Sequence, residues 1–216
     1  MVWGDIPGLT RSGHSVRRGR FGRGSMRLIS IAEYRSLWKE EFELLAAEIR
    51  GVVGKRVIRI DHIGSTAIPG LAAKDVIDIQ LTVAELDSES ATPALTSAGY
   101  RLNPENRHDL LTGLDPESPE LQKKFVREPT GIRHAHIHIR QEGRINQAYP
   151  LLFRDYLRAD PVASEAYCSV KKELASRFGE DPNAYYAIKD PYMDTIYQAA
   201  KLWAQVNQWK VDNEFM

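Results

Sequence analysis

The sequence contains a single cysteine, no excess of charge of either sign, and no long apolar run. Because Cys168 is alone among 216 residues, neither an intramolecular disulfide nor a zinc site built from several cysteines is available. Lys and Arg total 29, as do Asp and Glu, so the overall charge does not favour nucleic acid as a partner. No apolar run approaches the roughly 20 residues of a membrane span. These absences favour a cytoplasmic protein that neither spans a membrane nor binds nucleic acid.

Residues 1–25 differ in composition from the rest of the chain. They contain five Arg, six Gly and one Asp, and they lack the apolar core of a signal peptide. We therefore predict a disordered basic leader, followed by one folded domain over residues 26–216. A basic arm that touches nucleic acid is the alternative interpretation of residues 1–25.

The folded part opens with an amphipathic helix. Apolar side chains recur three and four residues apart between Ile31 and Ile49. The Ser30-Ile31-Ala32-Glu33 segment matches a capping box and predicts the start of this helix. Gly51 or Gly54 is expected to end it.

Two strands separated by a tight loop follow this helix. Residues 56–63 and 76–83 each predict a strand, and the loop between them begins with GSTAIPG. On the second strand Asp78 and Gln80 face one way, whereas Ile77, Ile79 and Leu81 face the other. An acid inside a strand is unusual, and a buried charge needs a partner.

A weak helix is predicted for residues 85–98, and a polar, irregular loop for residues 103–120. Residues 123–128 and 133–140 predict the two arms of a hairpin. Strand alternation places one polar row on the second arm, made of His134, His136, His138 and Arg140.

The chain is helical from Gln147 onward. Three Asp-Pro pairs, at 160–161, 181–182 and 190–191, each place an N-cap acid before a proline suited to the first helical turn. The expected fold class is therefore α/β (α+β), a small mixed sheet flanked by helices with a helical C-terminal half.

Four stretches of the sequence, taken in order, resemble the signature segments of the GrpB family, also called UPF0157. They are HIGSTAIPGLAAKDVIDIQL, HIHI, FRDYLRADP and YYAIKDPYMDTI, within a similarity that covers roughly residues 31–204. Members of this family occur alone or fused to dephospho-CoA kinase. The resemblance implies a nucleotidyltransferase-like fold, in which a Gly-Ser pair precedes an Asp-x-Asp pair on a strand.

The resemblance implies a site for ATP or another nucleoside triphosphate with Mg²⁺. Asp78 would hold the metal and act with His136 and His138 in catalysis. The expected contacts to substrate or phosphate are Gly64, Ser65, Thr66, Lys74, Gln80, Arg154 and Lys189. The implied reaction is nucleotidyl transfer, or ATP-dependent activation of a small-molecule substrate. Gln80 stands where related transferases carry a second acid, which favours a catalytically inactive nucleotide-binding module as an alternative.

The histidine row leaves three interpretations open. His134, His136 and His138 form a polar strand face with a buried, hydrogen-bonded member, contact a substrate phosphate, or bind a metal. The metal interpretation corresponds to a third function, a metal-dependent or histidine-dependent nucleotide hydrolase that uses the HAHIH strand.

We predict that deleting residues 1–25 leaves the stability of the folded domain nearly unchanged. The segment offers few groups to bury, so its loss removes little packing. Thermal melts of the full chain and of a chain starting at residue 26 should differ by less than about 5 °C. A larger drop would show that the segment packs on the domain.

Overall fold

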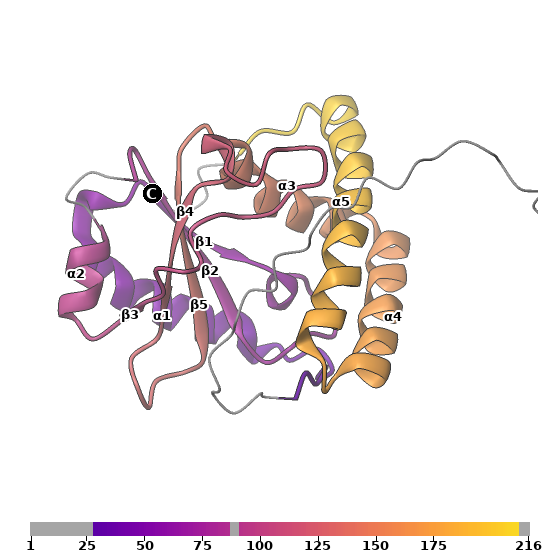
Figure 1. Ribbon diagram of the computed structural model, residues 1–216, viewed down its shortest axis with the longest axis horizontal. Coiled ribbons are helices and arrows are strands. Elements are labelled where there is room, and N and C mark those ends of the chain that lie inside the picture. The colour runs from indigo at the N-terminus through magenta and orange to yellow at the C-terminus, as the bar shows by residue number, and fades with distance from the viewer. Residues whose placement is uncertain (1–27, 87–90, 212–216) are drawn as a thin grey trace, which may run out of the picture.

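The computed structural model describes residues 28–86 and 91–211 (Figure 1). The predicted disordered leader, residues 1–25, lies outside these described residues. The strands are β1 Arg59–Ile63, β2 Ile77–Val83, β3 Arg101–Leu102, β4 Lys123–Arg127 and β5 Ala135–Gln141. The helices are α1 Leu37–Val53, α2 Ala91–Ser97, α3 Ile145–Ala159, α4 Pro161–Phe178 and α5 Pro182–Val206. In this part of the chain, no helix combines the length and apolar character needed to cross a membrane.

The five strands form one mixed sheet in the order β1-β2-β5-β4-β3. Strands β2 and β5 are parallel, and the other pairs are antiparallel. The predicted hairpin is confirmed as β4 and β5. Register places Asp78 of β2 beside His136 of β5, and Gln80 beside His138. The predicted mixed α/β fold with a helical C-terminal half is therefore confirmed.

The two faces of the sheet have different chemistry, as strand alternation predicts. Buried Ile77, Ile79 and Leu81 pack with the apolar side chains of α1 and α2 in the main core. The opposite face carries the polar side chains of β2 and β5. Figure 1 shows α1 and α2 on one side of the sheet and α3, α4 and α5 on the other. The polar face is therefore the one toward the helical C-terminal half.

The predicted capping box at Ser30 is wrong, because the helix begins at Leu37. Ala32 forms an isolated antiparallel bridge with Ala73, whose two backbone hydrogen bonds measure 2.8 and 2.9 Å. This bridge holds the segment extended, and Glu33 pairs with Lys172 of α4 instead of the helix end. The predicted end at Gly54 is confirmed, since this residue is the C-cap and has a φ of 57°.

The remaining helix ends show where local signals agree with tertiary packing. Asp160 and Asp181 cap α4 and α5, accepting backbone amides at 2.9 and 3.1 Å. The third expected cap, Asp190, is wrong because Asp190-Pro191 lies inside α5. Tyr185 and Tyr197 are buried on either side of Pro191, so packing carries the helix through the proline.

The helix predicted for residues 85–98 is observed only as α2. Residues 87–90 of that prediction lie outside the described residues. Gly99 follows α2 with a φ of 90°, a conformation that favours glycine at a helix end. The polar segment 103–120 is irregular up to a single 3₁₀ turn at Pro119–Leu121, as expected.

We predict that Asp181→Ala lowers the free energy of unfolding by about 1 kcal/mol, because the Ala184 amide loses its capping acceptor. Urea denaturation monitored by circular dichroism measures this change. Glu180→Ala is the matched control, since this neighbouring acid is exposed and precedes the helix. Its change should stay below about 0.5 kcal/mol. Equal losses in both variants would contradict a specific role for the cap.

Candidate functional site

The Gly-Ser turn leaves the end of β1 and lies directly against Asp78. Gly64 has a φ of 71°, a conformation that favours glycine, and Ser65–Ala67 form a 3₁₀ turn after it. A Cβ added to Gly64 would lie 2.4 Å from Oδ2 of Asp78 and 2.9 Å from its Cβ. Only glycine therefore allows this approach, which brings the turn and the carboxylate together as predicted.

Asp78 also contacts the two histidines that strand register places beside it. Its Oδ1 lies 3.2 Å from Nδ1 of His136 and 3.8 Å from Nε2 of His138. Burial opposes ionisation of Asp78, but hydrogen bonds from the two histidines hold its pKa well below the usual range. Burial, aided by Arg140, lowers the pKa of His138 to about 3. At neutral pH a carboxylate therefore faces a neutral His138.

Gln80 does not offer a free group to a ligand, which argues against its expected phosphate contact. It is fully buried, and its amide nitrogen donates to the Gln147 carbonyl at 2.9 Å. Its amide oxygen accepts from Arg140 at 2.8 Å. Arg140 in turn donates to Asp109, which also accepts from Lys123 at 2.6 Å. The residue is thus part of a buried network that joins β2, β5 and α3.

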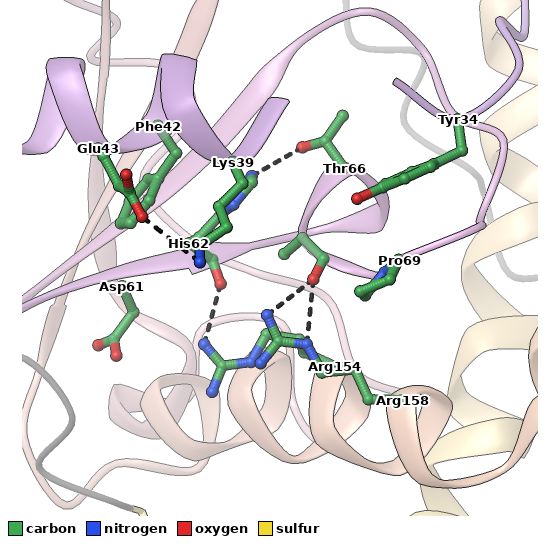
Figure 2. A pocket seen from close by; sticks show the side chains of 11 residues that line it. Tyr34, Lys39, Phe42, Glu43, Asp61, His62, Thr66, Pro69, Arg154 and Arg158 are labelled. Carbon is green, nitrogen blue, oxygen red and sulfur yellow. Dashed lines mark hydrogen bonds and ion pairs between the residues drawn. The ribbon is translucent and has the colours of Figure 1, made fainter. Parts of the chain in front are cut away.

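Arg154 and Thr66 make hydrogen bonds to protein groups around the turn. Arg154 of α3 donates to the His62 carbonyl at 3.0 Å, and Arg158 donates to the Ala67 carbonyl at 2.8 Å. Thr66 is buried, with its hydroxyl 3.0 Å from the His62 ring. Figure 2 shows both arginines reaching up from α3 to these carbonyls. In this structure the Arg154 guanidinium and the Thr66 hydroxyl are therefore engaged in supporting the turn and its neighbours, and their expected contacts to phosphate stay predictions.

The arginines and His62 line a pocket of about 110 Å³ between α1 and α3 (Figure 2). Asp78, His136 and His138 are not among its lining residues. The pocket therefore lies apart from the contact between the turn and Asp78.

Lys74 and Lys189, both expected to contact phosphate, meet at one aromatic ring. Lys74 hydrogen-bonds the hydroxyl of Tyr186, and the ammonium groups of Lys74 and Lys189 lie 4.9 and 5.6 Å from the centre of its ring. Lys189 also pairs with Asp190 at 2.8 Å. The structure therefore gathers two of the predicted cations, each with contacts inside the protein.

A third lysine and a tyrosine, which the sequence did not single out, join this group. Lys171 of α4 is buried, donates to the Ala72 carbonyl at 2.6 Å and lies over the ring of Tyr167. The Tyr167 hydroxyl hydrogen-bonds Ser65 of the turn. Burial lowers the pKa of Lys171 to about 7, and repulsion from Lys189 and Lys74 adds to this shift. Tyr167 and Lys171 are four residues apart on α4, and this spacing is the only sequence signal that pairs them.

We predict that Lys171 makes stability increase with pH between about 7 and 10.5. Its pKa is lowered from 10.5 to about 7 in the folded chain, so in this window the unfolded chain binds the extra proton. Below about pH 7 both states are protonated, and the full cost of burying the ammonium is felt. Lys171→Met should flatten the rise, which amounts to a few kcal/mol.

Urea denaturation at several pH values measures this difference. Lys172→Met is the matched control, because its neighbouring ammonium is exposed and pairs with Glu33. The control should keep the slope of the unmutated chain. A slope unchanged by Lys171→Met would show that the Lys171 ammonium is not held at a lowered pKa.

This chain is similar in sequence and in structure to known proteins. The sequence model of the family described as GrpB protein matches residues 28–199. A UPF0157 protein of Streptomyces coelicolor is 34% identical over 173 residues, covering 80% of this chain and 84% of that protein. Among solved structures, the conserved protein GrpB from Enterococcus faecalis has a TM-score of 0.64 and 29% identity, covering 81% of this chain and 99% of that chain.

A longer relative matches over almost the whole of this chain. A dephospho-CoA kinase of Mycolicibacterium paratuberculosis is 32% identical over 214 residues, covering 91% of this chain and 51% of the kinase. The chain thus spans about half the length of the first curated relatives it matches. Because one family model covers most of the described residues, the chain belongs to the GrpB family.

Proposed function

We propose that the site formed by Gly64, Ser65 and Asp78 binds a nucleoside triphosphate with Mg²⁺ and transfers its nucleotidyl group to a small molecule, or uses it to activate one. The observation that carries this proposal is the packing of the Gly64 backbone against the Asp78 carboxylate. This packing supports the proposal because a Gly-Ser turn can present amides to phosphate and an acid can hold the accompanying cation, in the order of the nucleotidyltransferase pattern.

The turn and the lysines supply the positive side of the site. Backbone amides at the start of a 3₁₀ turn have no partner within it, so those of Ser65 and Thr66 are suited to phosphate oxygens. Lys189 and Lys74 lie close enough to Lys171 to lower the pKa of its ammonium group. We assign them the neutralisation of phosphate charge, with Lys171 behind the other two.

Asp78 supplies the negative side, and a single carboxylate fits a cation that arrives with phosphates. Mg²⁺ is commonly held by one or two carboxylates together with phosphate oxygens and waters. When bound, the ion would polarise the phosphoryl group that reacts. Gln80 adds no charge, so Asp78 is the acid of β2 that faces this side.

His136 and His138 are assigned hydrogen bonds to the reacting groups. A general base works best with a pKa near the working pH, and the pKa of about 3 makes His138 a weak one. A neutral imidazole still donates and accepts hydrogen bonds, so His138 is better suited to orient a substrate. Nucleotide binding without transfer is the second candidate function, favoured by the buried amide of Gln80 in place of a second acid.

We predict that the chain binds nucleoside triphosphate in a Mg²⁺-dependent manner and that Asp78→Asn removes this dependence. Asparagine keeps the shape but loses the charge that compensates the ion for its lost waters. Isothermal titration calorimetry of ATP with and without Mg²⁺ measures both effects.

Asp75→Asn is the matched control, because the Asp75 carboxylate faces Trp38 and Arg35 rather than the turn. It should retain the Mg²⁺ dependence of the unmutated chain. Absence of binding at millimolar triphosphate would overturn the substrate class. Equal Mg²⁺ dependence in Asp78→Asn and the unmutated chain would show that Asp78 is structural.

A further inference from the structure

The two carboxylate oxygens of Asp78 face different groups. Oδ2 is the atom packed against Gly64, whereas Oδ1 lies 3.2 Å from His136 and 3.8 Å from His138. One oxygen of the carboxylate therefore contacts the turn, and the other oxygen lies next to the two imidazoles. The Oδ1 edge is therefore the one at which a ligand would be shared by the carboxylate and both imidazoles.

The two imidazoles are held in place by the sheet. The parallel register sets His136 beside Asp78, and alternation returns His138 to the same face two residues later. Phe125 of β4 packs its ring at 5.3 Å from His136 and 5.0 Å from His138, measured between ring centres. An apolar ring behind both imidazoles restricts their rotation, so their nitrogens stay near the carboxylate.

The donor set matches the preferences of first-row transition metals. One ligand atom from each of Asp78, His136 and His138 lies within 4.8 Å of the other two. Imidazole nitrogen suits Zn²⁺, Ni²⁺ and Co²⁺, whereas Mg²⁺ strongly prefers oxygen ligands. The neighbouring position on this face is occupied by Gln80, which is neutral and supplies no second carboxylate. Its amide nitrogen and oxygen are both used in hydrogen bonds within the protein.

The three side chains of the site are also partly exposed to solvent. A metal site that binds water or substrate needs such access. The side chains of His136, His138 and Asp78 are 22%, 16% and 28% exposed. Three protein ligands with an accessible face leave coordination positions for water or a phosphate oxygen, the arrangement of catalytic rather than structural metal sites.

We propose that Asp78, His136 and His138 form a site for a transition-metal ion of the Zn²⁺, Ni²⁺, Co²⁺ or Mn²⁺ class, which the chain binds in the absence of nucleotide. The inference rests on the proposed function for its location beside the turn, and it deepens that function by naming the ion the protein itself selects. It requires no bound triphosphate, since all three ligands belong to the chain.

Among the described residues, Arg140 competes with a metal ion for the imidazole of His138. Its Nη2 approaches Nδ1 of His138 at 3.4 Å, and metal binding at Nε2 needs a proton on that Nδ1. The other contacts of Arg140 are shorter, at 2.8 and 3.1 Å to Asp109 and 2.8 Å to Gln80. The approach to His138 is therefore the weakest contact of the guanidinium, and losing it leaves the arginine fully paired.

His134 lies on the same strand face but outside the site. Its Nδ1 is 3.0 Å from Oε1 of Glu128, and Arg127 lies against its ring. A histidine of the same strand that is occupied by another carboxylate provides a matched control for the two proposed ligands.

The test is titration of the full chain, without an affinity tag or nucleotide, with each metal chloride alone. Calorimetry should show one ion per chain, with affinity rising from Mn²⁺ through Co²⁺ to Ni²⁺, binding of Zn²⁺, and no saturation by Mg²⁺. His136→Ala, His138→Ala and Asp78→Asn should each weaken Zn²⁺ binding by at least about tenfold. His134→Ala should leave it unchanged.

X-ray absorption of the Co²⁺-loaded, unmutated chain gives a readout that does not depend on how well the variants fold. Two imidazole ligands are expected, and a spectrum with oxygen ligands alone would overturn the site. The site would also be overturned if Mg²⁺ saturated it as Zn²⁺ does, or if His134→Ala lowered the Zn²⁺ affinity as much as His136→Ala and His138→Ala do. If Mg²⁺-dependent ATP binding persists while no transition metal binds, only this inference fails. If metals bind and ATP does not, only the proposed function fails.

Discussion

The contact between the Gly64 backbone and the Asp78 carboxylate constrains the whole site. A side chain at position 64 would collide with Asp78, so the turn closes only with glycine. Arg154 and Arg158 then hold the carbonyls on either side of the turn from α3. The position of α3 and the shape of the turn are thereby coupled. A change that displaces this helix would move the turn amides and the acid relative to each other.

The replacement of a second acid by Gln80 follows from how α3 is attached to the sheet. The amide must donate to the Gln147 carbonyl at the start of α3 and accept from Arg140. A carboxylate has acceptors only, so an ionised acid at this position would face the Gln147 carbonyl without a proton to share. The buried polar network would lose a hydrogen bond where it joins two strands and a helix, and an unpaired buried acceptor is costly. A neutral amide is therefore a structural requirement here.

The sequence predicted those features that depend on short-range periodicity. Strand alternation placed His136 and His138 on one face of their strand, and the resemblance to the GrpB family grouped them with Asp78 and the Gly-Ser turn. The acids at Asp160 and Asp181 capped their helices as expected, because each cap is a local contact with the amide three residues along the chain.

Features set by distant segments were missed. The Ala32–Ala73 bridge overrides the capping signal at Ser30, and burial on both sides carries α5 through Pro191. Asp109 and Lys171 come from an irregular loop and a late helix, so no spacing rule connects them to β2. Arg154 was expected at the site, but its direction depends on which carbonyls the turn presents to α3.

The charge balance of the site follows from the same long-range packing. Lys171 has a lowered pKa because the fold buries it and brings Lys74 and Lys189 close. A polyanion placed among these ammonium groups would relieve their repulsion and favour protonation of Lys171. Under the proposed function, anion binding would therefore be coupled to proton uptake, a property that arises from the assembled fold and that no local segment contains.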